Sequence, residues 1–533
     1  MATVLNEPET AHEAEYDPSE PDIALLEDKF PEWFRISAAG TGWVFLIGIS
    51  FLVLSLRPLY HTDLWGHLSY GRLLWETGAL PATEPLMPLS EGVGYVDTAW
   101  LTQLLAYAAY QGAGKAGIVL LYALAGAAAV GILTARVYDR TRSSLIAAAV
   151  CVMTLFVEWQ QLMIVRPQCA GFLFYAVLLS VLLRCGRKRS DWWLIPGMFA
   201  LWANMHGSFA IGLATLACFA VGRGIDVLLR TRTLRGVFHD RKLRRLVLLT
   251  ELAAAATMLN PYGLRLWSEV LAVGNNPNLA SLIEWQMLHI RLAQGQAAFV
   301  AGLLLFAVYR WSPRGASTAE YLALAGLGCG MLWTSRLLMW WGPLAVCLIG
   351  IHGAAAWRRA RGTTIDFEPA PRASMWTIVA AFLCVIFLQL SSPGQVALKA
   401  ALGKGAKARA EKIPVSASTP IGAAGYLVEN PPNGLVFNSF ELGDYLVWAG
   451  PQDLQVMVTS HAHLVPHEVW DDYMSIIEMR GSYFAMLERY GVNTIVLDTG
   501  GQPALIERLR ESTEWTRVFE DDRSIIFDRR DPI

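Results

Sequence analysis

Residues 43–72 read WVFLIGISFLVLSLRPLYHTDLWGHLSYGR. The stretch up to Leu56 carries no charge and is apolar on every side of a helix, which is typical of a helix that crosses a lipid bilayer. A polar segment follows at once, with Arg57, Asp63, His67 and Arg72 within a short distance along the chain. An apolar helix followed by a polar loop is the pattern that repeats up to residue 391.

Uncharged runs recur at Ala116–Leu133, Pro167–Leu183 and Trp376–Leu390. The whole chain is 54% hydrophobic and 17% charged, whereas soluble proteins carry about 25% charged residues. The net charge of −2 gives no overall positive field, so we expect no nucleic-acid partner. The composition predicts a polytopic α-helical membrane protein that is surrounded by membrane lipids.

We predict about eleven transmembrane helices, each near the length that crosses a hydrocarbon core. They are placed near residues 38–56, 115–135, 143–165, 167–183, 192–204, 207–222, 243–259, 297–309, 319–334, 337–356 and 374–391. The loops on one side of these helices carry 21 basic residues and those on the other side carry six. Because cytoplasmic loops hold the excess of Lys and Arg, the basic side is expected inside the plasma (inner) membrane.

The segment 192–222 is almost uniformly apolar, but both of its flanks are strongly basic. Both flanks should therefore be cytoplasmic, which favours two short crossings over one long one. The connecting residues Asn204 to Gly207 would then lie below the outer surface, where irregular backbone is tolerated beside a cavity.

The two ends of the chain differ from the middle. Residues 1–36 are polar and acidic, and we predict a disordered cytoplasmic tail. The transmembrane domain spans 37–391 and includes a long first outer loop at 57–114, with an interfacial helix at Trp100–Tyr110. A linker at 392–412 leads to a soluble α/β domain at 413–533, which helix parity places outside the cell membrane.

Short runs typical of strands occur in this last domain at 434–438, 455–459, 493–497 and 524–527, with helical segments near 466–490 and 502–511.

The first outer loop holds the candidate catalytic residues Asp63, His67 and Glu84. Asp63 and His67 are four residues apart and share one face if the segment is helical. A carboxylate just outside a membrane helix could deprotonate an acceptor hydroxyl. Alternatively, Asp63 only caps the interfacial helix and His67 only packs.

Several short motifs carry a resemblance to a known family. They are Asp63-Leu-Trp-x-His67-Leu-x-x-Gly71-Arg72 with Gly78, Pro81 and Trp100-Leu101; Arg166-Pro167-Gln168; Trp202-x-Asn204-x-His206-Gly207-Ser208; Asn260-Pro261-Tyr262-Gly263; Glu284-Trp285; and Asn438-x-x-x-x-Gly443-Asp444-Tyr445-Leu446. Together they resemble GT-C-type integral membrane glycosyltransferases, in particular their large bacterial branch.

This resemblance implies a cell-envelope enzyme that takes a hexosyl or pentosyl group from a polyprenyl-phosphate carrier on the outer face, with Asp63 as the base. The chain departs from the family pattern at three places. Gly66 replaces an aromatic residue before the histidine, Glu84 stands where Asp is frequent, and Ser460-His-Ala-His463 replaces an Asp-Gly-Arg-like turn.

Five further polar residues are expected on the outer side and are candidates for substrate binding: Arg166, Asn204, His206, Glu284 and Arg336. The two arginines could hold a lipid phosphate or could extend to lipid headgroups. Asn204 and His206 could line a cavity or could join helices by hydrogen bonds.

A divalent cation could bind through Asp63 and Glu84, although the proposed chemistry does not require one. His461, His463 and His467 lack the regular spacing of a zinc site, so no metal site is predicted from them.

Two functions of other classes remain open at this point. One is a transporter or flippase of lipid-linked glycans, which should show inverted repeats and broken midplane helices. The other is a non-catalytic membrane scaffold whose soluble domain binds a partner.

Overall fold

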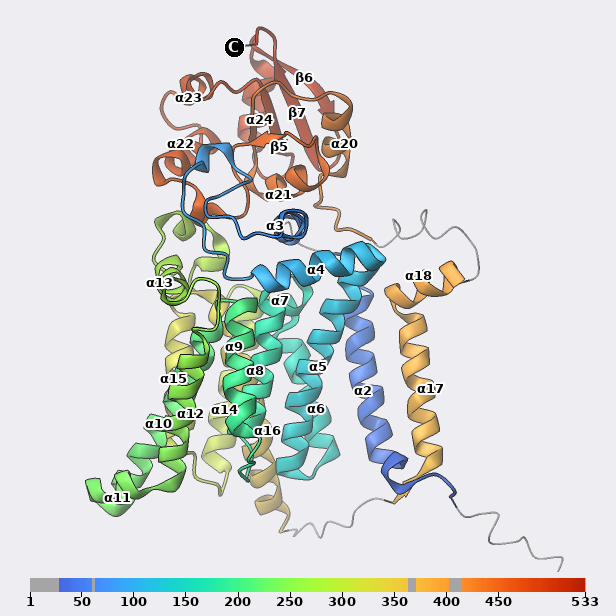
Figure 1. The fold of residues 1–533 in the computed structure, drawn as a ribbon, viewed down its shortest axis with the longest axis vertical. Coiled ribbons are helices and arrows are strands. Elements are labelled where there is room, and N and C mark those ends of the chain that lie inside the picture. The colour runs from blue at the N-terminus through green and yellow to red at the C-terminus, as the bar shows by residue number, and fades with distance from the viewer. Residues whose placement is uncertain (1–27, 60–62, 363–370, 402–413, 533) are drawn as a thin grey trace, which may run out of the picture.

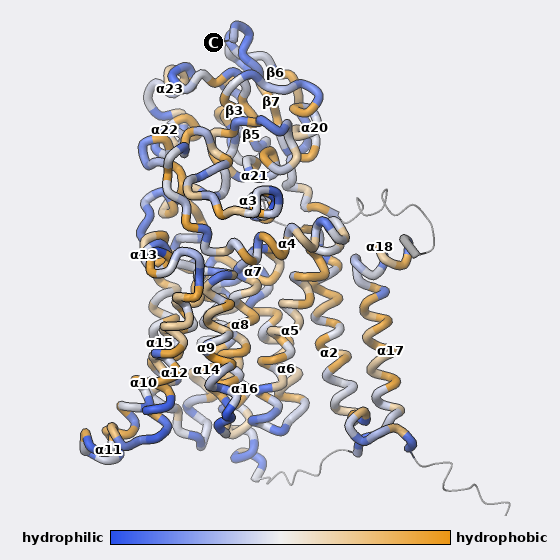
Figure 2. Tube along the Cα trace, in the orientation of Figure 1, coloured by the Kyte–Doolittle hydropathy of each residue, from blue (hydrophilic) through white to orange (hydrophobic). Residues whose placement is uncertain are grey.

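A computed structural model describes residues 28–59, 63–362, 371–401 and 414–532. Long helices run side by side through most of the chain, and a smaller domain with a β-sheet lies at one end of them (Figure 1). The helices are apolar over most of their length and hydrophilic at their ends (Figure 2). This distribution is typical of a membrane protein. The end of the bundle next to the sheet domain is called the domain-facing end below.

Each of the predicted transmembrane segments forms a helix. They are α2 (Ala38–Ser55), α5 (Lys115–Thr141), α6 (Ser144–Val157), α8 (Gln168–Leu182), α9 (Asp191–Met205), α10 (Phe209–Thr231), α12 (Arg241–Ala256), α14 (Ala293–Trp311), α15 (Thr318–Met331), α16 (Leu338–Arg361) and α17 (Ser374–Leu390). Polar side chains cap several of their starts. Ser37, Ser143, Asp240 and Ser317 each accept a hydrogen bond from a backbone N–H in the first turn.

By length and composition, four spans in the described part of the chain could cross a membrane: α2, α5, α10, and α16 with the turn before it. A fifth candidate is α17 with α18 (Ser392–Ala401), which meet at a bend of 82°. Helices α6 and α8 are apolar but shorter. The figure of eleven crossings therefore stays a prediction.

Two predicted segments lie partly outside the described residues. Of the tail at 1–36, the structure describes only the end, which forms η1 (Glu32–Phe34) and the start of β1 (Ile36–Ser37). Strand β1 pairs with β2 (Arg372–Ala373) in antiparallel register. Of the predicted linker at 392–412, the described part is helix α18.

The segment 192–222 forms two antiparallel helices, as the basic flanks predicted. Asp191, at the start of α9, accepts from Arg184 and from Arg245 of α12, each at 2.6 Å. Arg223 of α10 pairs with Asp240, the cap of α12, at 2.7 Å. The start of α9 and the end of α10 therefore lie at the same end of the bundle, away from the sheet domain (Figure 1).

The first loop forms two helices outside the bundle, α3 (Asp63–Thr77) and α4 (Trp100–Ala113). Helix α4 crosses the domain-facing end of the bundle and α3 lies between α4 and the sheet domain (Figure 1). Gly71 allows this packing, because a Cβ atom there would lie 2.4 Å from the backbone oxygen of Gln103. The prediction of a helix at Trp100–Tyr110 is confirmed.

The C-terminal domain contains a five-stranded sheet of order β4-β3-β5-β7-β6. Strands β3, β4 and β5 are parallel, and β7 and β6 continue the sheet in antiparallel fashion. Its elements are α20 (Ile421–Glu429), β3 (Leu435–Asn438), α21 (Phe440–Ala449), β4 (Gln455–Val456), η6 (Ala462–Leu464), α22 (His467–Ile477), α23 (Tyr483–Arg489), β5 (Thr494–Asp498), α24 (Pro503–Glu511), β6 (Trp515–Glu520) and β7 (Ser524–Arg529).

Helix α21 joins this domain to α3. The ring of Trp65 lies 5.0 Å from that of Tyr445, centroid to centroid, and the Arg72 guanidinium lies 4.7 Å from the Trp448 ring. Arg72 also donates to the backbone oxygens of Val447 and Trp448. The domain therefore packs directly on the first loop.

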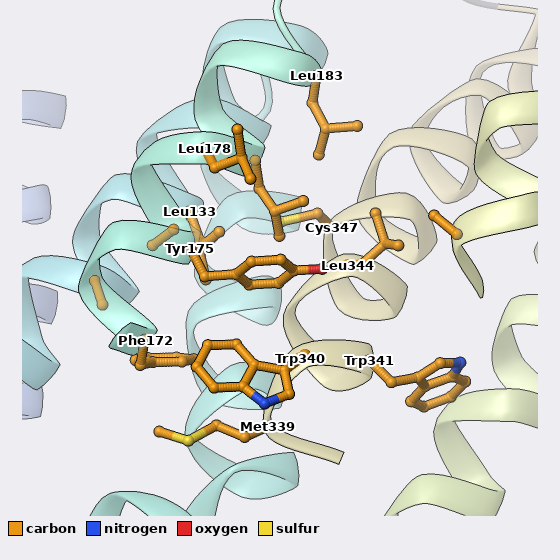
Figure 3. Packing of buried hydrophobic residues seen from close by; sticks show 14 of the residues in the cluster. Leu133, Phe172, Tyr175, Leu178, Leu183, Met339, Trp340, Trp341, Leu344 and Cys347 are labelled. Atoms are coloured by element: carbon orange, nitrogen blue, oxygen red, sulfur yellow. The ribbon is translucent and has the colours of Figure 1, made fainter. Parts of the chain in front are cut away.

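The main core of the bundle lies between α5, α8 and α16. Figure 3 shows the ring of Tyr175 between Cys347 and Trp340, and the Tyr175 and Trp340 rings meet edge to face at 5.4 Å. Tyr175 and Phe172 are fully buried. This packing fixes α8 and α16 against each other, so their first residues are held together at the domain-facing end.

Candidate functional site

A cavity of about 390 Å³ lies between the domain-facing end of the bundle and the C-terminal domain. Its walls come from the first loop, the start of α8, the break between α9 and α10, the segments η4 (Ile283–Trp285) and η5 (Ser335–Leu337), and the turn after β4. A cavity of this size is typical of sites that bind small organic groups.

Three helices begin at the wall of this cavity. Gln168 opens α8, Ser208 precedes α10 and Leu337 precedes α16, and all three residues line the cavity. The start of an α-helix carries the positive end of the helix dipole. The part of the cavity wall formed by these helix starts therefore favours an anionic group such as a phosphate.

A chain of four charged side chains crosses the cavity wall. Nε of Arg166 lies 2.7 Å from Oδ2 of Asp63, and Nη1 of Arg166 lies 2.6 Å from Oε2 of Glu284. Arg336 reaches Oε1 of Glu284 at 3.5 Å, and its guanidinium lies 4.6 Å from the Trp285 ring. Burial alone would raise the pKa of Glu284, but Arg166 and Arg336 outweigh it and the pKa is lowered. The Glu284 carboxyl is therefore expected to be charged.

The two arginines differ in how tightly they are held. The side chain of Arg166 is 7% exposed and contacts two carboxylates, whereas that of Arg336 is 27% exposed and contacts one carboxylate at a longer distance. Arg166 is thus fixed in the wall, and Arg336 has more freedom to meet a ligand.

His67 lies one helical turn after Asp63 on α3, and Gln103 of α4 orients its ring. The amide nitrogen of Gln103 lies 3.1 Å from Oδ1 of Asp97 and 3.2 Å from Nδ1 of His67. Because the Asp97 oxygen accepts, the amide nitrogen must face it, and its second hydrogen then points to Nδ1 of His67. Burial lowers the pKa of His67 to about 4. The ring is therefore neutral and carries its proton on Nε2.

Six of the predicted site residues line the cavity: Asp63, His67, Arg166, His206, Glu284 and Arg336. His206 lies in the break between α9 and α10, where the sequence predicts irregular backbone. Its Nδ1 lies 2.7 Å from Oγ of Ser208, which stabilises the break.

Glu84 and Asn204 do not line the cavity. The Glu84 carboxylate accepts from the Tyr70 hydroxyl and from the backbone N–H of Leu86, each at 2.7 Å, and burial raises its pKa. Since Glu84 faces Tyr70, a cation held jointly by Asp63 and Glu84 does not fit this arrangement.

The amide of Asn204 is used between helices. It accepts from Trp100 Nε1 at 3.0 Å and donates to the backbone oxygens of Ala200 and Leu259, each at 2.8 Å. Asn204 therefore connects α4, α9 and the turn after α12. This agrees with the alternative expectation, that Asn204 joins helices by hydrogen bonds.

Sequence reasoning did not assign Ser460, His461 and His463 to the site, although these residues, which follow β4 in the C-terminal domain, line the cavity. The ring of His461 packs edge to face on His67 at 5.3 Å and on Tyr70 at 4.8 Å. His467, considered with them as a metal ligand, lies on the outside of α22 and contacts Asn278. Among the described residues, no group of three His, Cys, Asp or Glu side chains has the geometry of a metal site.

Two of the three departures from the family pattern, Gly66 and the Ser460–His463 turn, lie close together in space. A Cβ atom on Gly66 would lie 2.2 Å from Oδ1 of Asp444 and 3.4 Å from Cε1 of His461. An aromatic side chain at position 66 would therefore displace both residues of the C-terminal domain. The sequence departs from the family pattern both at Gly66 and in the Ser460–His463 turn. These paired departures were the one sign in the sequence that the first loop and the turn could be in contact.

The fold was compared with those of known proteins. No family model and no curated protein sequence matches the chain. Among solved structures, ArnT from Cupriavidus metallidurans bound to undecaprenyl phosphate is similar at 15% identity with a TM-score of 0.50, over 92% of this chain and 98% of that one. The Archaeoglobus fulgidus oligosaccharyltransferase in complex with Zn and sulfate is similar at 12% identity with a TM-score of 0.52, over 92% and 73% of the two chains.

The same oligosaccharyltransferase in its apo form is similar at 10% identity with a TM-score of 0.50, over 86% of this chain and 69% of that one. These likenesses cover both the helical bundle and the C-terminal domain. The chain thus shares the fold of these solved structures, the GT-C fold.

Proposed function

We propose that the protein is a membrane glycosyltransferase that moves a sugar from a polyprenyl-phosphate donor to an acceptor hydroxyl at the outer face of the membrane. The observation that carries this proposal is the position of the Asp63 carboxylate. It lies in the cavity wall, 2.7 Å from Arg166, beside three helix starts that favour an anion. A base and an anion site thus share one cavity.

The donor phosphate is assigned to Arg336 and the starts of α8, α10 and α16. Arg336 is the more exposed of the two cavity arginines and has the looser contact with Glu284. A guanidinium suits a phosphate because its N–H groups form two parallel hydrogen bonds. Arg166, which contacts both Asp63 and Glu284, would instead orient the base.

In the transfer step, the acceptor oxygen forms a bond to the anomeric carbon while Asp63 takes the hydroxyl proton. The bond between that carbon and the phosphate oxygen breaks, and its electron pair leaves with the phosphate. The leaving group is then an anion held by Arg336 and the helix starts. Because a phosphate is a stable leaving group, the step needs no second acid.

The distribution of charge supports the outer location. The basic segments between the helices lie at the end of the bundle opposite the C-terminal domain. One of them contains the short helix α11 (Leu234–His239) (Figure 1). Since basic loops stay in the cytoplasm, the cavity would open on the outer side, where a lipid-borne donor and a water-borne acceptor can meet.

Purified protein in lipid nanodiscs, incubated with a panel of radiolabelled polyprenyl-phosphate sugars and with hydroxyl-bearing acceptors such as methyl hexosides, tests the proposal. Release of free polyprenyl phosphate from at least one donor is expected with the wild type and not with Asp63→Asn. Equal release by the two proteins, or release from no donor by the wild type, would contradict the proposal.

A further inference from the structure

The turn Ser460–His463 brings unused polar groups of the C-terminal domain into the cavity. We propose that this turn is the acceptor subsite and that it takes an uncharged, hydroxyl-rich acceptor such as a neutral glycan. The inference rests on the proposed function and adds the chemical class of the acceptor.

The position of the turn suits an acceptor that comes from water. Helices α8 and α16 reach the cavity from the bundle, which is where a lipid-borne donor lies. The turn reaches it from the C-terminal domain, which stands outside the bundle (Figure 1). The two substrates would therefore enter from different sides and meet near Asp63.

The turn is held rigidly by its neighbours. The side chain of Asn278 donates to the backbone oxygens of Ala462 at 2.9 Å and Val465 at 2.8 Å. Asn276 donates to the His463 oxygen at 3.1 Å, and Asp444 accepts from the Ser460 N–H at 3.3 Å. Binding groups that are fixed before the ligand arrives lose little entropy when it binds.

His461 has a polar atom that no neighbour satisfies. The residue is 7% exposed, and its Nδ1 has no hydrogen-bond partner among the described residues. Its ring is packed edge to face against Tyr70 and His67, so it cannot turn away from the cavity. His461 nevertheless lines the cavity, so a ligand there would meet the rest of the imidazole while Nδ1 itself stays enclosed.

The charges around the cavity disfavour an anionic acceptor. Three carboxylates line it, those of Asp63, Glu269 and Glu284. Among the described lining residues the only basic side chains with a fixed charge are Arg166 and Arg336, and both already contact carboxylates. Once the donor phosphate occupies Arg336, no cation is left for a second anion.

Neutral imidazoles match hydroxyl groups instead. Burial, with a smaller contribution from the neighbouring His67, lowers the pKa of His461 to about 3. A neutral imidazole has one N–H donor and one acceptor nitrogen. A hydroxyl group both donates and accepts, so a polyol can satisfy His461 and His463 together.

Saturation-transfer NMR on the full-length protein in nanodiscs tests this inference, with methyl hexosides as neutral probes and the corresponding hexose 6-phosphates as anionic ones. The wild type should bind at least one methyl hexoside more tightly than its 6-phosphate. His461→Phe keeps a flat ring against Tyr70 and His67 but removes both nitrogens. It should weaken hexoside binding by about three- to tenfold, the usual effect of one lost hydrogen bond.

His461→Asn, which restores a donor and an acceptor, should recover part of the affinity. His239→Phe, on α11 at the far end of the bundle, should bind as the wild type does. Binding of farnesyl phosphate reports on the donor site and should be the same in all these variants. A His461→Phe protein with wild-type hexoside affinity, or a wild type that prefers the 6-phosphates or binds no hexoside, would overturn the inference.

The two proposals fail separately. If farnesyl phosphate does not bind but hexosides bind through His461, the donor assignment fails and the subsite stands. If farnesyl phosphate binds and hexosides do not, the subsite fails and the donor assignment stands.

Discussion

Arg166 holds the carboxylate of Asp63 through Nε, at 2.7 Å from Oδ2, while its Nη1 holds Glu284 at 2.6 Å. One guanidinium thus fixes two carboxylates that come from distant parts of the chain, α3 and η4. Arg166 is therefore expected to orient Asp63, and Arg336 to bind the donor phosphate.

Substitution of Arg336 should weaken donor binding, whereas substitution of Arg166 should slow the transfer step. Arg336→Gln should raise the Kd for farnesyl phosphate by roughly ten- to hundredfold, since a hydrogen bond to a charged group contributes about 1.5–3 kcal/mol. Arg166→Gln should lower kcat more than it raises that Kd, because it releases Asp63. Isothermal titration and transfer kinetics measure the two quantities.

Arg517→Gln is a matched control, because Arg517 lies on the edge strand β6, its side chain is 56% exposed and it does not line the cavity. It should change neither quantity. Equal losses of donor affinity in the Arg166 and Arg336 variants would contradict the division of roles.

Gly66→Ala should loosen the C-terminal domain. The added Cβ would lie 2.2 Å from Oδ1 of Asp444, and overpacking of this kind typically costs about 1–3 kcal/mol. Asp444→Ala removes the obstructing carboxylate. The Tm of the Gly66→Ala, Asp444→Ala double variant should therefore be higher than the value obtained by adding the Tm changes of the two single variants. Strictly additive shifts in Tm would show that the two residues do not compete for this space.

Asp97 should make stability depend on pH. Burial raises the pKa of Asp97 to about 7 in the folded protein, above the usual value of about 3.9 for an unfolded chain. Between these values the folded state binds the proton and the unfolded state does not, so stability from this group falls as pH rises toward 7. Asp97→Asn cannot titrate. Its Tm relative to the wild type should therefore be higher at pH 7 than at pH 5, and an unchanged difference would reject the shift.

Membrane orientation can be measured with reporter fusions. Alkaline phosphatase at the C-terminus should be active, because it folds outside the cytoplasm. The same reporter fused after His239, in the basic segment that follows α10, should be inactive. The reverse pattern would place the cavity on the cytoplasmic side and reject an outer-face reaction.

The sequence was most informative where hydrophobicity decides the structure. The apolar runs identified the helices, and basic flanks identified the break between α9 and α10. Strand β6 was missed because it is an edge strand whose charged residues Arg517 and Glu520 interrupt any apolar pattern. Helix α21 was missed because it is short and is buried from two sides: Leu442 and Leu446 pack on the sheet, and Tyr445 contacts α3.

Within the site, the residues near membrane-helix ends were found because polar side chains are rare there. In the sequence, Glu84 and Asn204 could not be told apart from the polar residues that line the cavity. In the structure their side chains form hydrogen bonds with Tyr70 and Trp100, which the fold brings close to them. His461 was not assigned to the site because its partners on α3 lie far away along the chain. Such long-range contacts leave no local pattern to read.

The central claim is that Asp63 is the base, and Asp63→Asn tests it most directly. Asparagine keeps the size of the side chain and its ability to cap α3, but it cannot take a proton. Glu84→Gln is the matched control, since Glu84 is a first-loop carboxylate that does not line the cavity. Sugar transfer by Asp63→Asn should fall by roughly 10²–10⁴, the usual range for loss of a general base, with Tm near that of the wild type, while Glu84→Gln retains most of its activity. Wild-type transfer by Asp63→Asn, with donor consumed at the same rate, would contradict the account.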